Sequence, residues 1–304
     1  MKIMLSLLPI IIALVSGYAL GKASPDSITR PLIRLISPLV WGLLLLIGFE
    51  FGEVVSSASS IGLILKTAVI FALCTTVVPC ILILSARGKT QPREITQSRK
   101  FSLGLVWPPL RECLIALSMV VMGGALFVLQ EHVAIGFLAM PSSNALLLLL
   151  ILLVGVDLAQ VKLDRRWFSR SMLTVPVLVV VGSLIGGAVA AWMTGESLKT
   201  SLALSSGYGW FTLSSVLIGD ALGQTYGTMA LMTDLLRELL AIVVLYALGR
   251  HDPYVSIGSA GATALDSTLP IIKQACSPDA VPLALVSGFL LTLLAPVFIT
   301  FILT

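Results

Sequence analysis

Two acidic side chains, Glu238 and Asp266, stand in apolar segments where an ionised group is costly. Glu238 follows Arg237 inside a leucine-rich run, and Asp266 lies in a run of small residues. An ionised carboxylate at the centre of a bilayer costs at least about 3 kcal/mol. A chain keeps such a group where it faces a cavity, a partner or a permeation path. Carboxylates in that setting can bind a cation or carry a proton.

The first of these acids belongs to a charged cluster, DLLREL, at residues 234–239. At helical spacing Asp234 and Glu238 share one face, and Arg237 lies one turn from Asp234. In one interpretation the three form a neutralised structural salt bridge. In the other, Arg237 pairs with Asp234 and leaves Glu238 free to face a cavity. The sequence leaves both open.

The second acid lies in a segment whose glycines and proline destabilise a continuous helix, residues 258–270. Unwound backbone at membrane depth is tolerated only against protein or water. Its free N–H and C=O groups suit a ligand that carries both an ammonium group and a carboxylate. We therefore assign Gly261, Thr263 and Asp266 to a binding site. The alternative is close packing of small residues, with Asp266 bonded to a backbone amide.

A third polar segment, residues 205–215, combines glycines and hydroxyl groups with aromatic rings. Aromatic faces over a glycine break can hold a cationic amine, so we add Ser206, Gly207, Tyr208 and Trp210 to the candidate site. Alternatively, the two aromatic side chains anchor the chain at the membrane interface.

The elements that position these residues follow from composition. Of 304 residues, 57% are hydrophobic and only 11% are charged, with a mean hydropathy of +1.05. A soluble domain carries about 25% charged residues. The composition predicts an all-α polytopic membrane protein, a single integral membrane domain over residues 1–304. The net charge of +4 then gives no argument for binding nucleic acid.

Eight apolar stretches are long enough to span a bilayer. They lie near residues 3–21, 35–52, 61–84, 110–130, 144–160, 172–193, 228–248 and 280–303. Two further stretches, 200–222 and 254–275, are broken by small residues and proline. If they are re-entrant hairpins, entering from outside and inside respectively, the chain has eight spans. If both cross fully it has ten, which suits two inverted five-helix repeats.

Basic residues fill alternate connections, which places those connections in the cytoplasm and the N-terminus outside. Either span count also places the C-terminus outside. Weak internal echoes pair residues 15–21 with 181–187 and residues 46–50 with 153–157. They favour internal duplication, with chance similarity as the rival explanation. Two further acids, Glu50 and Asp157, lie near helix ends, where side chains are more often solvated, so we rank them lower.

Enzyme, metal and cofactor signatures are missing. The chain has no Gly-x-Ser-x-Gly, His-Glu-x-x-His or Walker A pattern, which argues against hydrolysis and against ATP-driven transport by this chain alone. The four cysteines contain no Cys-x-x-Cys pair, and the two histidines have no i, i+4 partner. We expect neither a metal site nor a cofactor.

Three motifs in the C-terminal third carry a resemblance. The order SGYGW at 206–210, DLLREL at 234–239 and GATALDSTLP at 261–270 closely resembles the bacterial lysine exporter family, LysO. The resemblance spans nearly the whole chain. It implies an exporter of L-lysine and its analogue thialysine in the bacterial inner membrane, with both termini periplasmic. It also implies an essential glutamate and aspartate, which match Glu238 and Asp266.

The family is distantly similar in fold to cation/proton antiporters and bile-acid transporters, which contain discontinuous helices. This chain departs from the family pattern at Glu50, Glu112 and Asp157, where neutral residues are commoner. Competition between lysine and protons at Glu238 and Asp266 is our hypothesis for the mechanism. The rivals are a transporter of this fold with another substrate, and a membrane scaffold or lipid-modifying enzyme. The coupling ion, the preference among basic amino acids and the oligomeric state are left open.

Overall fold

Long α-helices form most of the computed structural model, which describes residues 2–55, 58–87, 103–132, 143–160 and 170–304. No strand occurs within these residues, so the chain is an all-α polytopic membrane protein as the composition predicts. Eight of the described helices correspond to the eight predicted spans: α1 (Lys2–Ala23), α3 (Ile36–Val55), α4 (Ala58–Arg87), α5 (Leu103–His132), α6 (Ser143–Gln160), α7 (Arg170–Thr194), α10 (Gln224–Leu248) and α13 (Val281–Leu303).

Apolar side chains cover these helices on all sides, because the outer faces contact lipid and the inner faces contact the protein core, and both surroundings are apolar. Four described stretches are long and apolar enough to cross a membrane by length and composition alone: Ser27–Phe49, Ile61–Ala86, Met172–Thr194 and Pro278–Leu303. The structure adds one short helix that the sequence did not predict, α2 (Asp26–Arg34), which leads into α3.

Glycines let several of the long helices approach closely. Gly17 of α1 packs on the backbone of α6, Gly48 of α3 on that of α5, and Gly186 of α7 on that of α4. Small residues commonly serve this purpose in membranes, where helices gain little from burying apolar area. The similarity of residues 46–50 to residues 153–157 aligns Gly48 with Gly155, and each packs closely on the backbone of a neighbouring helix, so a shared packing requirement accounts for this pair.

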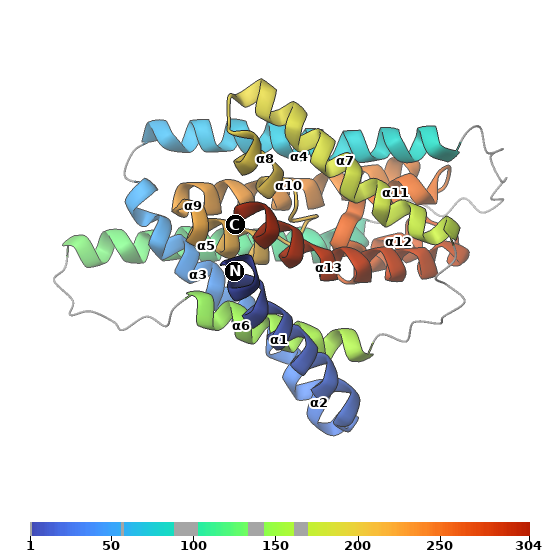
Figure 1. Cartoon of the computed structure of the whole chain (residues 1–304), viewed down its shortest axis with the longest axis horizontal. Helices are drawn as coiled ribbons and strands as arrows, with labels where there is room; N and C mark the ends of the chain where they lie inside the picture. The colour runs from blue at the N-terminus through green and yellow to red at the C-terminus, as the bar shows by residue number, and fades with distance from the viewer. Residues whose placement is uncertain (1, 56–57, 88–102, 133–142, 161–169) are drawn as a thin grey trace.

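The helices form two groups that Figure 1 shows one above the other. The peripheral group consists of α1, α3, α5 and α6, whose main contacts are with one another. The hairpin group consists of α4, α7, α10 and α13, which surround the two broken segments. The groups meet mainly where α3 contacts α10 and α1 contacts α13.

The first broken segment is a re-entrant hairpin, made of α8 (Leu198–Leu204) and α9 (Phe211–Leu222). Glu196 precedes α8, and Tyr226 follows α9 at the start of α10. The Tyr226 hydroxyl donates to Glu196 Oε2 at 3.2 Å, so the segment enters and leaves at the same face. At its tip, between the end of α8 and the start of α9, Tyr208 and Gly209 have positive φ angles of 52° and 95°, which help to reverse the chain.

The second broken segment is a hairpin from the opposite face. It comprises α11 (Pro253–Ala260), a 3₁₀ turn η2 (Gly261–Leu265) and α12 (Leu269–Ala275), followed by η3 (Pro278–Ala280). The end of α12 returns to the end of α10, where Ala275 packs on Gly249 and Tyr246 donates to Gln274 at 3.4 Å. The described helices therefore form eight spans with two inverted hairpins, and the ten-crossing alternative is wrong.

Charge marks one face of the bundle. The ends of α1, α4, α6 and α10 lie at the same face, which we call the basic face; at the ends of α6 and α1, for example, the Gln160 side chain donates to the Gly21 carbonyl at 3.1 Å. Among the described residues, Lys22, Arg34, Arg250 and Lys273 lie at that end of the chain's helices. The second hairpin enters from this face and the first from the other. Most residues of the two longest basic connections lie outside the described residues.

The hairpin tips meet at Gly261. The Ala262 amide donates to the Tyr208 carbonyl at 2.9 Å, and Gly261, with φ of 65°, packs directly on that carbonyl. We expect Gly261→Ala to lower stability by more than the roughly 1–2 kcal/mol of left-handed strain, because the new methyl group collides with the partner tip. Thermal unfolding in detergent measures this. Gly62→Ala, at an exposed helical site with open space, is the control, and equal stability of the two variants would contradict the prediction.

Candidate functional site

A cavity of about 370 Å³ lies between the two helix groups. Its size falls within the ordinary range of small-molecule sites. The peripheral wall comes from α2, α3 and α6, at the ends of these helices near the basic face. The hairpin wall comes from both hairpin tips, α10 and α13. The lining residues that the following argument uses are Asp157, Trp210, Glu238, Thr263, Asp266 and Ser267.

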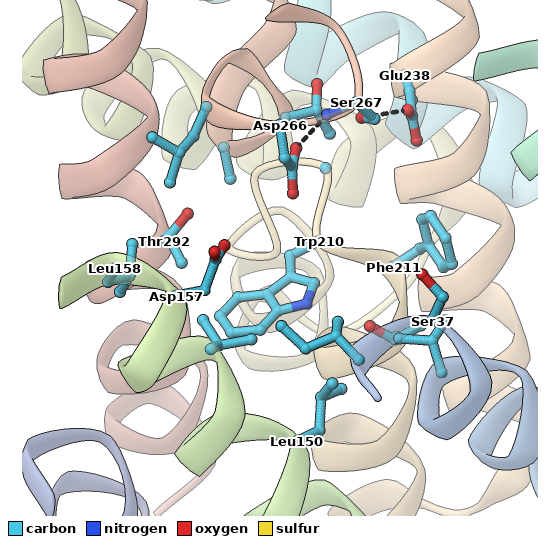
Figure 2. Close-up of a pocket in the computed structure, with 18 of the residues that line it drawn as sticks. Ser37, Leu150, Asp157, Leu158, Trp210, Phe211, Glu238, Asp266, Ser267 and Thr292 are labelled. Atoms are coloured by element: carbon cyan, nitrogen blue, oxygen red, sulfur yellow. Dashed lines mark hydrogen bonds between the residues drawn. The ribbon is translucent and has the colours of Figure 1, made fainter. Parts of the chain in front are cut away.

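Asp266 and Glu238 form an acidic pair joined by Ser267 (Figure 2). Asp266 ends the 3₁₀ turn of the second hairpin, and one of its carboxylate oxygens accepts from the Ser267 amide at 2.6 Å. The Ser267 hydroxyl donates to Glu238 Oε1 at 2.7 Å. Asp266 is exposed to the cavity, whereas Glu238 is only 3% exposed. The backbone bond predicted by the packing alternative is therefore present, yet the carboxylate still faces open space.

A third carboxylate enters from the opposite wall. Asp157 lies in the last turn of α6, and Figure 2 shows its side chain pointing into the same cavity as Asp266 and Trp210. It is close enough to Asp266 for the two charges to interact. Three acids thus share one cavity, and like charges repel there unless a proton or a cation lies between them.

The remaining lining is apolar or neutral. None of the cavity-lining residues in the described part of the chain is a lysine, arginine or histidine. Trp210 forms part of the floor, and Thr263 hydrogen-bonds to Ala260 within its own turn at 2.8 Å. The site is therefore suited to a cationic ligand with an aliphatic portion. Within the described residues no group of three histidine, cysteine or acidic side chains is arranged to hold a metal.

Asp234 lies outside the cavity lining and forms hydrogen bonds with the tip of the first hairpin. It is 1% exposed. Its Oδ1 accepts from the Gly209 amide at 2.9 Å, and its Oδ2 accepts from the Ser214 hydroxyl at 2.6 Å. Gly207 packs so closely on this carboxylate that a side chain there would overlap it. Asp234 therefore fixes the turn that presents Trp210 to the cavity.

Arg237 is buried between the two tips. Its guanidinium lies 5.9 Å from the centre of the Tyr208 ring and next to Gly261. Within the described part of the chain, its Nε and Nη2 atoms have no hydrogen-bond partner. The acceptor atoms of Asp234 bond to Gly209 and Ser214 instead, so Arg237 offsets the charge of Asp234 through space. Glu238 lines the cavity while Asp234 and Arg237 lie outside its lining, but Arg237 acts on Asp234 only through space and Glu238 accepts from Ser267, so neither of the two interpretations is met in full.

The ten residues assigned from the sequence divide into two sets. Four line the cavity: Trp210, Glu238, Thr263 and Asp266. The other six lie outside its lining, in or beside the region where the two hairpin tips meet: Ser206, Gly207, Tyr208, Asp234, Arg237 and Gly261. Tyr208 is fully buried and Trp210 lies in the cavity wall, so the interpretation of these two as interfacial anchors is wrong.

Sequence reasoning ranked Asp157 too low and missed Ser267 as a bridge. Asp157 does lie near a helix end, but α6 is short and its end packs against the cavity. An acid inside a short apolar run was the available signal. Ser267 is adjacent to Asp266, and nothing in the sequence indicates its bond to Glu238. The side chains of Glu50 and Glu112 lie outside the described residues.

Comparison with known proteins identifies the family. The pattern of the family described as lysine exporter LysO matches residues 117–303. The lysine exporter LysO of Escherichia coli is 39% identical over 165 residues, which cover 54% of this chain and 55% of that protein. A putative lysine exporter of Haemophilus influenzae is 34% identical over 162 residues, covering 53% of this chain and 83% of that protein.

The chain spans about half the length of the Escherichia coli relative in this alignment. No solved structure matches the chain. The family match covers more than half of the chain and includes both hairpins, α10 and all three acids of the described cavity lining. The chain belongs to the lysine exporter LysO family.

Proposed function

We propose that the protein exports L-lysine and its analogue thialysine from the cytoplasm in exchange for protons. The observation that carries this proposal is a cavity between the two helix groups that contains three carboxylates, with no cationic side chain among its described lining residues. Lysine brings two ammonium groups and one carboxylate. The acidic pair of Glu238 and Asp266 binds an ammonium group when both acids are ionised.

A place for the substrate carboxylate lies at the start of α9. Trp210 occupies the N-cap position and makes no side-chain capping bond. The first N–H groups of a helix have no partner within that helix, and they attract negative charge. Phe211 and Thr212, the first two residues of α9, line the cavity. Together with the acids they offer complementary groups for a zwitterionic amino acid.

The electrical work of export supports exchange with protons. Lysine carries a net charge of +1, and moving it against a potential that is negative inside costs about 2.3 kcal/mol per 100 mV. One incoming proton cancels this charge movement, and two make the potential favour export. When Glu238 and Asp266 are protonated, they no longer attract the lysine cation. The site can then return to the cytoplasmic side without lysine and with its protons.

The proposed orientation follows the positive-inside rule, with the basic face in the cytoplasm of the bacterial inner membrane and both termini periplasmic. The peripheral wall of the cavity is built by the basic-face ends of α2, α3 and α6. In this orientation the cavity lies in the cytoplasmic half of the protein, as the substrate-loading state of an exporter requires.

Transport by purified protein in proteoliposomes tests the coupling. We expect an imposed pH gradient, with protons moving opposite to lysine, to accelerate export several-fold at a clamped membrane potential. The reason is that protons then displace lysine from the carboxylates on the release side only. Protein-free vesicles with the same gradient are the control. Lysine movement that is indifferent to the gradient would exclude proton exchange while leaving lysine export standing.

Another substrate on the same fold is the alternative. The cavity lining disfavours an organic anion such as a bile acid, because an anion would meet three carboxylates and no cationic side chain among the described lining residues. Counterflow of labelled lysine, competed by other basic amino acids, separates the remaining possibilities. Failure of unlabelled lysine to drive counterflow would exclude lysine as the substrate.

A further inference from the structure

Asp157 differs from the other two cavity acids in its contacts with the described part of the chain. Within the described residues it makes no hydrogen bond or ion pair, whereas Glu238 and Asp266 are both held by Ser267. Its neighbours in the lining include the aliphatic Val154 and Leu158 and the hydroxyl-bearing Thr292, which Figure 2 shows beside it. A carboxylate in such a place gains most from a ligand that brings its own positive charge.

The position of Asp157 determines which ligand group it can reach. It projects from the peripheral group, while Glu238 and Asp266 project from the hairpin group on the other side of the cavity (Figure 2). A ligand whose single ammonium group is bound by Glu238 and Asp266 brings no second cation to Asp157. A ligand with two ammonium groups joined by an aliphatic chain satisfies both, and its chain lies over Trp210 and the apolar lining.

We propose that Asp157, an acid that this chain carries where neutral residues are commoner in the family, adds specificity for a diamino acid by binding its side-chain ammonium, while Glu238 and Asp266 bind the α-ammonium. The inference rests on the proposed function, which it deepens by naming the group that the site uses to select a substrate. The distance across the cavity then selects the length of the side chain. Monoamino acids of the same shape are bound poorly because Asp157 stays unpaired.

Competition in the counterflow assay tests this role. Asp157→Asn keeps the shape of the side chain and removes its charge. We expect the concentration of lysine for half-maximal counterflow to rise about 10- to 100-fold, the effect of losing one charge-assisted hydrogen bond. Inhibition by norleucine, which has no side-chain amine, should stay within about twofold of the wild-type value because norleucine makes no such bond. A merely structural residue would affect both ligands alike.

Asp157→Glu supplies the rescue arm. It restores the charge and reaches one methylene further into the cavity. We expect the preference of lysine over ornithine to shift toward the shorter ornithine by about tenfold, because the site is now narrower. Asp279→Asn removes an exposed acid at the basic-face end of α13, outside the cavity, and should leave all these values unchanged.

The outcomes separate this inference from the proposed function. If the wild-type protein shows no lysine counterflow, the proposed function fails. Suppose that the wild type transports lysine. If Asp157→Asn then needs the same lysine concentration for half-maximal counterflow, Asp157 is not a specificity residue. The same conclusion follows if the variant binds lysine and norleucine more weakly by the same factor. An unchanged ratio of lysine to ornithine in Asp157→Glu would also overturn the assignment.

Discussion

Asp266→Asn and Glu238→Gln are each expected to reduce lysine transport at least about 100-fold, because each removes a charge-assisted bond to the substrate and a proton-binding group. Both amides keep an oxygen that can accept the existing bond from Ser267, which is 2.6 Å long at Asp266 and 2.7 Å at Glu238. The hairpin should therefore fold normally. What is lost is the charge that attracts an ammonium group and the ability to exchange it for a proton.

The measurement is counterflow of labelled lysine, with protein yield and size-exclusion profile recorded for each variant. Ser267→Ala is an informative partner variant, because it removes the bridge but leaves both charges in the cavity. We expect it to weaken transport about tenfold, corresponding to one lost hydrogen bond to a charged group. Near-normal counterflow in Asp266→Asn or Glu238→Gln would remove that residue from the substrate site.

Asp234→Ala should act on folding instead of on substrate binding. The change leaves the Gly209 amide without its acceptor and leaves the Ser214 hydroxyl only the longer bond to the Phe211 carbonyl at 3.3 Å. It also leaves the buried charge of Arg237 without its nearby acid. Breaking a buried charged network by removing one partner typically costs about 3–5 kcal/mol. We expect a large drop in the thermal stability of the purified protein and a low yield in the membrane.

Graded variants at the same place separate hydrogen bonding from charge. Ser214→Ala removes one neutral donor to the Asp234 carboxylate and should cost about 1.5–3 kcal/mol, the usual cost of losing a hydrogen bond to a charged group. Asp234→Asn retains an acceptor for the Gly209 amide but leaves Arg237 uncompensated, so it should fall between the two. Wild-type stability in Asp234→Ala would show that the hairpin tip is held by packing alone.

Glu238 and Asp266, the two acids with the largest expected effects on transport, are both evident from the sequence. An acid inside an apolar run is conspicuous because its cost depends on the surrounding composition, which the sequence displays directly. The same reasoning left open whether Glu238 faces a cavity or forms a neutralised cluster with Asp234 and Arg237. In the structure Glu238 lines the cavity and Asp234 binds the hairpin tip, because α9 packs along α10 beside Asp234.

The role of Asp157 could not be predicted from the sequence. Asp157 precedes Asp266 by more than a hundred positions, and no local pattern connects them. They meet because α6 packs with α1 and α3, and because this group lies against the hairpin group. Long-range packing of this kind depends on how small residues let particular helices approach, which is a property of pairs of helices and not of one segment.

The sequence by itself determined the membrane class, the eight spans, the two broken segments and the candidate acids Glu238 and Asp266. Hydropathy, charge alternation and helix-breaking residues are local properties, and a bilayer acts on them one segment at a time. Only the tertiary structure decided that the broken segments are opposed hairpins, that Asp234 and Arg237 support their tips, and that Asp157 completes the cavity. These outcomes depend on which helices pack together, and that choice is made by contacts between residues far apart in the chain.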